Sequence, residues 1–297
     1  MKVRNIALAF GAAALILLMG SCDALFSNQF KAWGLGQVTN ATINEAVTNN
    51  DVAAILEQSG LEDGGISDSF LNAATQDQAT ADAVKALLQE TIDDPEAPVE
   101  TVQAAQVLII EIELEMNGGG DFIANIVDAI SAIDFETFDF SDPATITNIF
   151  AALFPARDAK TLPEGWSQAE IAELINNVAA LGTNIDDLIA TFQDVGNQFL
   201  PNGVDAGWMA QVGAVVRILN MVEPNVLIYH DENGDGDLGA ALAALIDYGT
   251  SNPNGITIEN YITNSDDILD EIKADTGLKA LLKAAGWDMD ELFLAEE

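Results

Sequence analysis

The sequence predicts a mainly α-helical protein, with helical hairpins or a helical bundle in one or two lobes and at most a minor β element. Two observations support this fold class. Apolar residues make up 49% of the chain and recur at helical spacing along its length, as they do in helices that bury one face. Glycine, proline and acidic capping residues divide these runs into segments of ordinary helix length.

Three helices are predicted before the glycine run that begins at Gly118. They cover residues 44–58, 80–92 and 99–116. In the third segment helix and strand compete, because Glu111, Glu113 and Glu115 alternate with apolar residues after a continuous apolar run. We favour helix, since the uninterrupted segment is longer than an ordinary strand and glycines end it.

Two further amphipathic helices are predicted at 121–133 and 142–154. Between them, residues 135–140 alternate apolar and acidic side chains, which is a weak strand signal and the one candidate β element. Residues 155–165 contain two prolines and form the predicted linker between two lobes. These lobes are helical lobe 1 at 37–154 and helical lobe 2 at 166–297.

The second lobe is predicted to continue as a series of helices. They lie at 167–181, 184–199, 204–222 and 238–248 and in a segment that ends at Lys273. A short motif recurs, because residues 182–188 resemble residues 286–292. In each copy a glycine ends one helix, Asn184 or Asp288 caps the next, and an acidic residue follows three positions later. We therefore interpret these acids as helix caps and not as catalytic groups.

The chain is strongly acidic, with 48 Asp and Glu against 10 Lys and Arg and a formal net charge of −38. This balance excludes nucleic acid as a partner, and it excludes a basic contact with anionic lipid head groups, because both need clustered Lys and Arg. Most carboxylates must lie on solvated faces. Two interpretations remain open, namely adaptation to a saline habitat and a surface that collects cations.

The first 21 residues have the organisation of a secretory signal peptide. Lys2 and Arg4 form a basic start, residues 6–18 form an apolar segment too short to span a membrane, and small residues precede Cys22. The segment resembles the leader of bacterial lipoproteins, whose cleavage box ends in a cysteine. That resemblance implies that residues 1–21 are removed and that Cys22 carries fatty acyl chains such as palmitate.

The implied location is the cell envelope, with the protein held by its lipid on the periplasmic face or the cell surface of a bacterial membrane. Residues 22–36 would form a tether whose aromatic residues Phe26, Phe30 and Trp33 suggest docking onto the body. The alternative is a soluble secreted protein in which Cys22, the only cysteine, is free or pairs between chains.

An acidic loop in the second lobe has the spacing of a calcium site. Oxygen-bearing residues occupy its first, third and fifth positions, and Gly236 occupies the sixth, where a sharp turn is needed. The loop resembles those of EF-hand and dockerin-like proteins. The resemblance implies calcium as the bound ion, with ligands Asp231, Asn233, Asp235 and, through its carbonyl, Asp237. The acidic residue that closes the site in that family is replaced here by Leu242. The alternative is a strand-to-helix turn whose acids cap the following helix.

The sequence contains no recognisable set of catalytic residues. His230 is the only histidine, and no Gly-x-Ser-x-Gly elbow, phosphate-binding loop or dinucleotide motif is present. We interpret His230 as structural, with a pH switch beside the acidic loop as the alternative. The predicted function is a non-enzymatic binding or assembly module of the cell envelope, with a groove between helical hairpins for a protein partner or a small apolar ligand. A carboxylate-dependent envelope hydrolase and a calcium-organised structural module are the alternatives.

Overall fold

The computed structural model describes residues 38–61, 65–131, 151–154, 166–195, 200–201 and 203–222, together with 239–240, 243, 271 and 274–284. Within these residues the protein consists of helices packed against one another and contains no strand, which confirms the mainly α-helical fold class. The candidate β element at 135–140 lies outside the described residues.

The prediction of a single helix at 44–58 is wrong, because the chain forms two helices there. α3 spans Asn40–Thr48 and α4 spans Val52–Ser59. Between them Asn50 has a φ of 53°, and the carboxylate of Asp51 accepts a hydrogen bond of 3.0 Å from the third N–H of α4. Asn tolerates the left-handed conformation and Asp is a strong helix cap, so the chain turns after α3 and begins a second helix, α4.

A short helix, α5 at Asp68–Ala74, has no counterpart among the predicted elements. The Ser67 hydroxyl caps it by accepting a hydrogen bond of 3.2 Å from the Phe70 N–H. Phe70 is buried in the core. The helix α5 has only seven residues, which are fewer than the window over which helical periodicity can be recognised.

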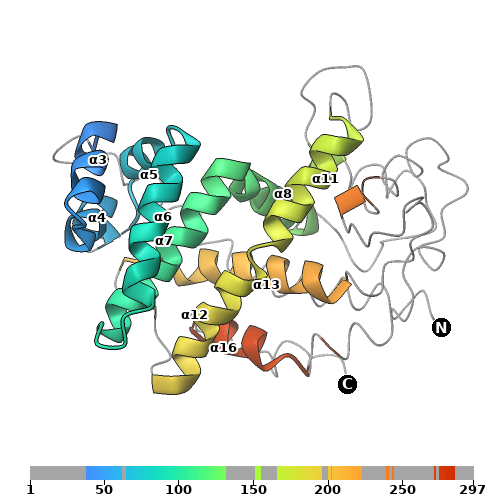
Figure 1. Ribbon diagram of the computed structural model, residues 1–297. Helices are drawn as coiled ribbons and strands as arrows, with labels where there is room; N and C mark the ends of the chain where they lie inside the picture. Colours follow the sequence, from blue (N-terminus) through green and yellow to red (C-terminus); the bar gives the residue numbers. More distant parts are fainter. Residues whose placement is uncertain are drawn as a thin grey trace, which may run out of the picture.

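Two longer helices form a hairpin at the centre of the described structure (Figure 1). α6 spans Gln78–Ile92 and α7 spans Val99–Asn117, which confirms that the second of these segments is a helix and not a strand. All residues from 103 to 110 of α7 are buried, because this helix packs against α6, α8, α11 and α12. Gly118 then ends α7 with a φ of 67°, a conformation that favours glycine.

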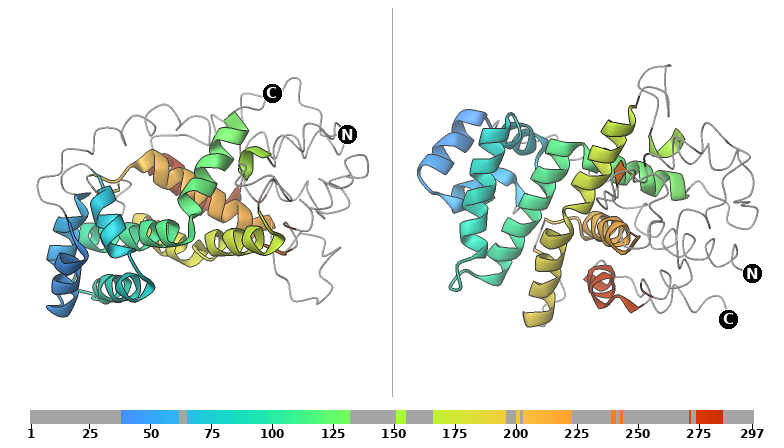
Figure 2. Two further views of the ribbon diagram at one scale, coloured as in Figure 1. Left: turned by 90° about the horizontal axis from the view of Figure 1, so that it is seen from above. Right: turned by 45° about the vertical axis from the view of Figure 1, so that its right-hand side comes forward.

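Five further helices are described. They are α8 at Gly119–Ser131, α11 at Gln168–Ala179, α12 at Gly182–Val195, α13 at Ala206–Val222 and α16 at Thr276–Ala284. Seen from above, α6 lies in front, α7, α11 and α12 form a middle layer, and α8 and α13 lie behind (Figure 2). α13 crosses behind α12 and also packs against α11 and α16. The predicted cap at Asn184 is wrong, since α12 already begins at Gly182.

Helices from before and after residues 155–165 share one apolar core. α7 packs against α12, and α8 packs against α11. The indole N–H of Trp208 on α13 donates a hydrogen bond of 2.9 Å to Glu111 on α7, and the rings of Phe154 and Trp166 meet edge to face at 5.6 Å. The predicted linker itself lies outside the described residues, but these contacts bring the helices of both predicted lobes together.

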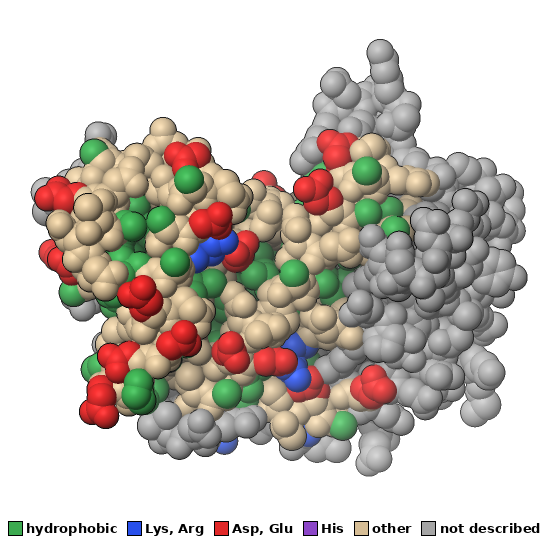
Figure 3. All heavy atoms as spheres, in the orientation of Figure 1, with side chains coloured by type: hydrophobic (Ala, Val, Ile, Leu, Met, Phe, Trp, Pro, Cys, Tyr) green, Lys and Arg blue, Asp and Glu red, His purple; other side chains and the backbone are tan. Residues whose placement is uncertain are grey.

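Acidic side chains are spread over the described face of the molecule, and the two larger groups of basic atoms on it each lie between acidic side chains (Figure 3). Such a spread agrees with the expectation that most carboxylates are solvated. In the part of the chain that the structure describes, no helix combines the length and the apolar character needed to cross a membrane.

Candidate functional site

The site residues predicted from sequence lie outside the described residues. These are Cys22, Asp231, Asn233, Asp235 and Asp237, and the same holds for His230. The described segment nearest to the acidic loop is Gly239, whose N–H donates a hydrogen bond of 2.8 Å to the side chain of Asn176 on α11. Among the described residues, no group of three or more His, Cys, Asp or Glu is placed to hold a metal ion.

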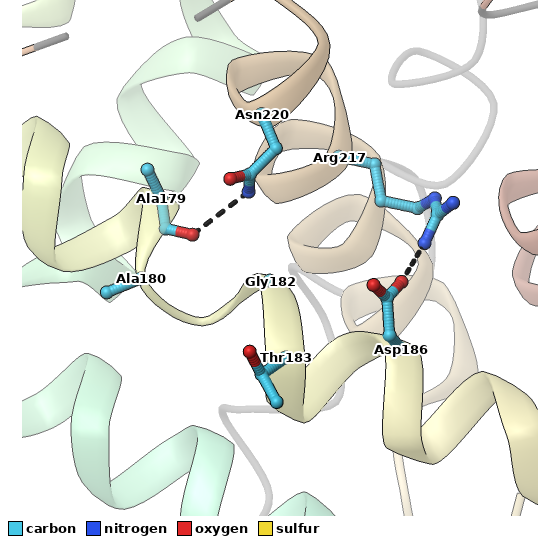
Figure 4. Close-up of a pocket in the computed structure, with 7 residues that line it drawn as sticks. All are labelled: Ala179, Ala180, Gly182, Thr183, Asp186, Arg217 and Asn220. Atoms are coloured by element: carbon cyan, nitrogen blue, oxygen red, sulfur yellow. Dashed lines mark hydrogen bonds and ion pairs between the residues drawn. The ribbon is translucent and has the colours of Figure 1, made fainter. Parts of the chain in front are cut away.

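A pocket of about 390 Å³ opens where α11 turns into α12, facing the last turns of α13 (Figure 4). Three small residues and four polar residues line it. The small ones are Ala179, Ala180 and Gly182, and the polar ones are Thr183, Asp186, Arg217 and Asn220. Its walls therefore come from three helices that meet only in the folded chain, and this pocket is our candidate functional site.

Arg217 forms one wall of the pocket and binds two carboxylates from other parts of the chain. Its Nε lies 2.8 Å and its Nη2 lies 2.7 Å from Oδ2 of Asp275, which precedes α16. Its Nη1 also bonds Asp186 on α12, and the two side chains point toward one another (Figure 4). The planar guanidinium suits such paired contacts. One cation thus joins α12, α13 and the start of α16.

Asp275 has a structural task that uses both of its oxygens. Its Oδ1 accepts hydrogen bonds of 2.7 and 2.9 Å from the N–H groups of Gly277 and Leu278, so it caps α16. Its Oδ2 accepts both Arg217 contacts. A Cβ on Gly277 would lie 3.0 Å from the guanidinium carbon, so glycine allows the arginine to lie flat against the helix start. Asp275 has no oxygen left for acid–base chemistry, which leaves Asp186 as the carboxylate of the pocket.

Asn220 fixes the opposite wall. Its amide nitrogen donates to the carbonyls of Ala179, at 2.9 Å, and Val216, at 2.8 Å. The first of these bonds satisfies a carbonyl at the end of α11, where no further helical N–H follows. Gly182 lies beside this amide (Figure 4), and a Cβ there would come within 2.9 Å of the amide nitrogen. The wall is therefore held by hydrogen bonds and has little room to shift.

A second polar cluster surrounds Lys85 on α6. Its Nζ lies 2.6 Å from Glu113 on α7 and 3.1 Å from Asp82 on its own helix. Burial lowers the pKa of Lys85, but the hydrogen bonds that its ammonium donates to Glu113 and Asp82 outweigh burial, so the net pKa lies above its ordinary value. The pKa of Asp82 is lowered by hydrogen bonds from Gln78 and Lys85. This cluster ties the hairpin together, and none of its residues lines the pocket.

Four glutamines have a buried amide atom without a hydrogen-bond partner among the described residues. They are Gln58 on α4 and Gln103 and Gln106 on α7, with their carbonyl oxygens, and Gln211 on α13, with its nitrogen. The Gln103 nitrogen is satisfied, because it donates a hydrogen bond of 2.9 Å to Thr191 on α12. An unpaired buried amide atom costs about 1–3 kcal/mol. None of the four lines the pocket, and nothing in the structure explains the unpaired atoms.

The pocket was not predicted from the sequence, although the sequence contains one signal for it. Arg217 is the only Lys or Arg between Lys160 and Lys273, and it interrupts an apolar helix. Comparison of the chain with protein-family models, with curated proteins and with solved structures found no match. The geometry of the pocket is therefore what supports a ligand site there.

Proposed function

We propose that this protein is a non-enzymatic binding module of the cell envelope, anchored through lipid on Cys22, that takes a small polar ligand in the pocket between α11, α12 and α13. The single observation behind the ligand site is the pocket of about 390 Å³ with four polar side chains on its walls. This volume lies in the range of about 300–1,000 Å³ that is typical of small-molecule sites.

The lining favours binding over catalysis. The Asn220 amide nitrogen and Oδ1 of Asp275 bond to the backbone, and Arg217 is engaged with two carboxylates. Two carboxylates that act as acid and base would need free oxygens facing one reacting bond. Only Asp186 offers such an oxygen among the pocket residues. The same polar lining favours a polar ligand over the apolar ligand that the sequence predicted.

The ligand site can be tested with the full chain in detergent and three matched probes at fixed ionic strength near pH 7. The probes are 4-aminobutanol, 1,4-butanediol and 4-hydroxybutanoate, and binding is measured by ligand-observed NMR titration. We expect at least one probe to bind, and Gly182→Val to abolish that binding, because a side chain there meets the Asn220 amide.

Gly120→Val is the matched control for this test. It makes the same replacement in the first turn of α8, where a Cβ would meet no atom within 4 Å. We expect it to bind the probes as the wild type does. If no probe binds, or if both variants lose binding equally, the pocket is not the ligand site and the proposal is wrong.

The lipid anchor needs its own test. Metabolic labelling with a palmitate analogue should tag the wild-type chain and Ser21→Ala but not Cys22→Ala, because only the cysteine sulfur and the amine released by cleavage beside it accept acyl chains in the lipoprotein scheme. Label on all three chains, or on none of them, would contradict the anchor.

The calcium-organised module remains a second candidate, favoured by the spacing of Asp231, Asn233, Asp235 and Gly236. A thermal melt of the full chain in detergent compares calcium, magnesium and chelator at fixed ionic strength. Calcium alone should raise the melting temperature, and Asp231→Ala combined with Asp235→Ala should remove that rise. A rise that persists in the double variant would place the ion elsewhere.

A further inference from the structure

The pocket contains an arginine, yet the formal charge of this arginine and its two carboxylate partners together is negative. Arg217 contributes one positive charge, and Asp186 and Asp275, which it contacts directly, contribute two negative charges. The set therefore has a formal charge of −1 inside a chain of net charge −38. A carboxylate or phosphate ligand would have to enter a negative field.

The pocket offers both donors and acceptors, because three of the five N–H groups of Arg217 face carboxylates and two remain for other partners. Both N–H groups of the Asn220 amide have backbone partners, so its carbonyl oxygen is the atom it can still offer. Asp186 uses Oδ1 for Arg217, and its Oδ2 has no partner among the described residues. Its side chain is 64% exposed, which leaves that oxygen accessible. Only the hydroxyl of Thr183 can act as donor or acceptor.

Two of the helix ends around the pocket also favour a positively charged ligand. Ala179 and Ala180 lie at the carboxyl end of α11, and Arg217 and Asn220 lie in the last turns of α13, which ends at Val222. The carboxyl end of a helix carries a partial negative charge, which favours a cation. The amino end of α12 at Gly182 opposes this, but it faces two carboxyl ends and carries Asp186 in its second turn.

We propose that this pocket selects a small organic cation, with an ammonium group that binds Asp186, over neutral and anionic molecules of the same size. The inference depends on the proposed binding function and names the chemical class of its ligand. One positive charge on the ligand neutralises the −1 set, and an ammonium group supplies an N–H donor for Oδ2 of Asp186.

The three matched probes test the charge preference directly, since they share a hydroxyl and a four-carbon skeleton and differ in charge at one end. We expect 4-aminobutanol to bind at least about tenfold more tightly than 1,4-butanediol, which corresponds to about 1.4 kcal/mol, and 4-hydroxybutanoate to bind least. Asp186→Asn should remove the preference, because it keeps the shape of the side chain and deletes its charge. Raising the ionic strength should weaken the preference as well.

Asp187→Asn is the matched control, because it deletes the same charge from the neighbouring, exposed residue of the same helix, which does not line the pocket. The preference for the ammonium probe should persist in it. If the three probes bind equally, or the anion binds best, and Gly182→Val abolishes that binding, the cation inference is wrong while the binding function stands. If Asp187→Asn removes the preference as fully as Asp186→Asn, the selectivity comes from the general acidity of the chain and the inference is also wrong. If no probe binds, both proposals fail.

Discussion

Lys85 and Arg217 are both isolated cations, and the structure uses them differently. Lys85 is the only Lys or Arg between Lys31 and Arg157, and each of the two cations binds two carboxylates. The partners of Lys85 lie on its own helix and on the next one, which a short loop already connects. The partners of Arg217 lie 31 and 58 residues away in the sequence.

The difference indicates where a scarce positive charge stabilises an acidic chain most. The Lys85 cluster reinforces a hairpin that its own loop and apolar packing already hold. Arg217 holds the start of α16 against α13 and α12, and it compensates Asp275, whose side chain is only 6% exposed. A carboxylate that is this buried is costly without a partner. We therefore expect the same loss of charge to have a larger effect at Arg217.

The largest effect is predicted for Arg217→Leu, which should lower the free energy of unfolding by about 2–4 kcal/mol, because it leaves the buried Asp275 carboxylate without its cation. Denaturant unfolding of the full chain in detergent measures the loss, and hydrogen exchange should increase first in α16. Arg217→Lys keeps the charge without the planar fork, so an intermediate loss is expected. A loss smaller than that of the matching Lys85 variant would contradict the comparison.

A smaller effect is predicted for Lys85→Met. It should lower the free energy of unfolding by about 0.5–1 kcal/mol, which is typical of partly exposed ion pairs, while the thioether chain keeps the packing of the lysine stem. Lys283→Met on α16 is the control, because Lys283 is exposed and should show almost no change in the same unfolding experiment. Equal losses for the two variants would mean that the Glu113 contact contributes nothing measurable.

The parts of the fold that follow from local patterns could be predicted from the sequence. The helix at Val99–Asn117 follows from its long apolar run and from Gly118, and the start of α11 follows from a capping box in which Ser167 and Glu170 bond each other's backbone N–H groups. The break between α3 and α4 was missed, because Asn50 and Asp51 interrupt the helix without glycine or proline. Their apolar neighbours, such as Ile55, keep helical spacing across the break.

The candidate site could not be predicted in the same way. Its residues come from the end of α11, the start of α12 and the last turns of α13, and only the crossing of these helices brings them together. A local sequence pattern does not specify how two helices cross, because the crossing depends on which of their apolar faces pack against each other. The isolation of Arg217 within an apolar helix predicts that it needs acidic partners, but not that Asp186 and Asp275 provide them.

Alanine variants of two glycines compare the Lys85 hairpin with the pocket wall through smaller changes in the free energy of unfolding. Gly120→Ala, close to the end of the Lys85 hairpin, should raise the free energy of unfolding by about 0.5–1 kcal/mol, because alanine favours a helix and its Cβ meets nothing within 4 Å. Gly182→Ala should forfeit that gain, because its Cβ would lie 2.9 Å from the Asn220 nitrogen and disturb a hydrogen bond worth about 1 kcal/mol. Paired thermal melts measure the difference, and equal stabilisation by both variants would mean that the pocket wall is less tightly held than its contacts indicate.

The smallest predicted effect is a pH dependence of stability, which should differ between Lys85 and Arg217 because an ammonium and a guanidinium differ in chemistry. The folded-state pKa of Lys85 lies above its usual value of 10.5 and that of Asp82 below its usual value of 3.8. The Lys85 cluster therefore contributes its full stability between about pH 4 and pH 10. The contribution of Lys85 is lost as the pH rises through its raised pKa, and that of Asp82 is lost as the pH falls through its lowered pKa.

The stability difference between wild type and Lys85→Met should accordingly shrink above about pH 10.5, as the pH rises from the usual pKa of lysine through the raised pKa of Lys85. A guanidinium does not deprotonate in proteins, so the difference between wild type and Arg217→Leu should persist over the same alkaline range. Denaturant unfolding at a series of pH values between 7 and 11.5 measures both differences on the same chain. If both shrink together, the alkaline loss reflects general repulsion among the carboxylates and tyrosinates of the chain, and the Lys85 cluster does not titrate as its contacts indicate.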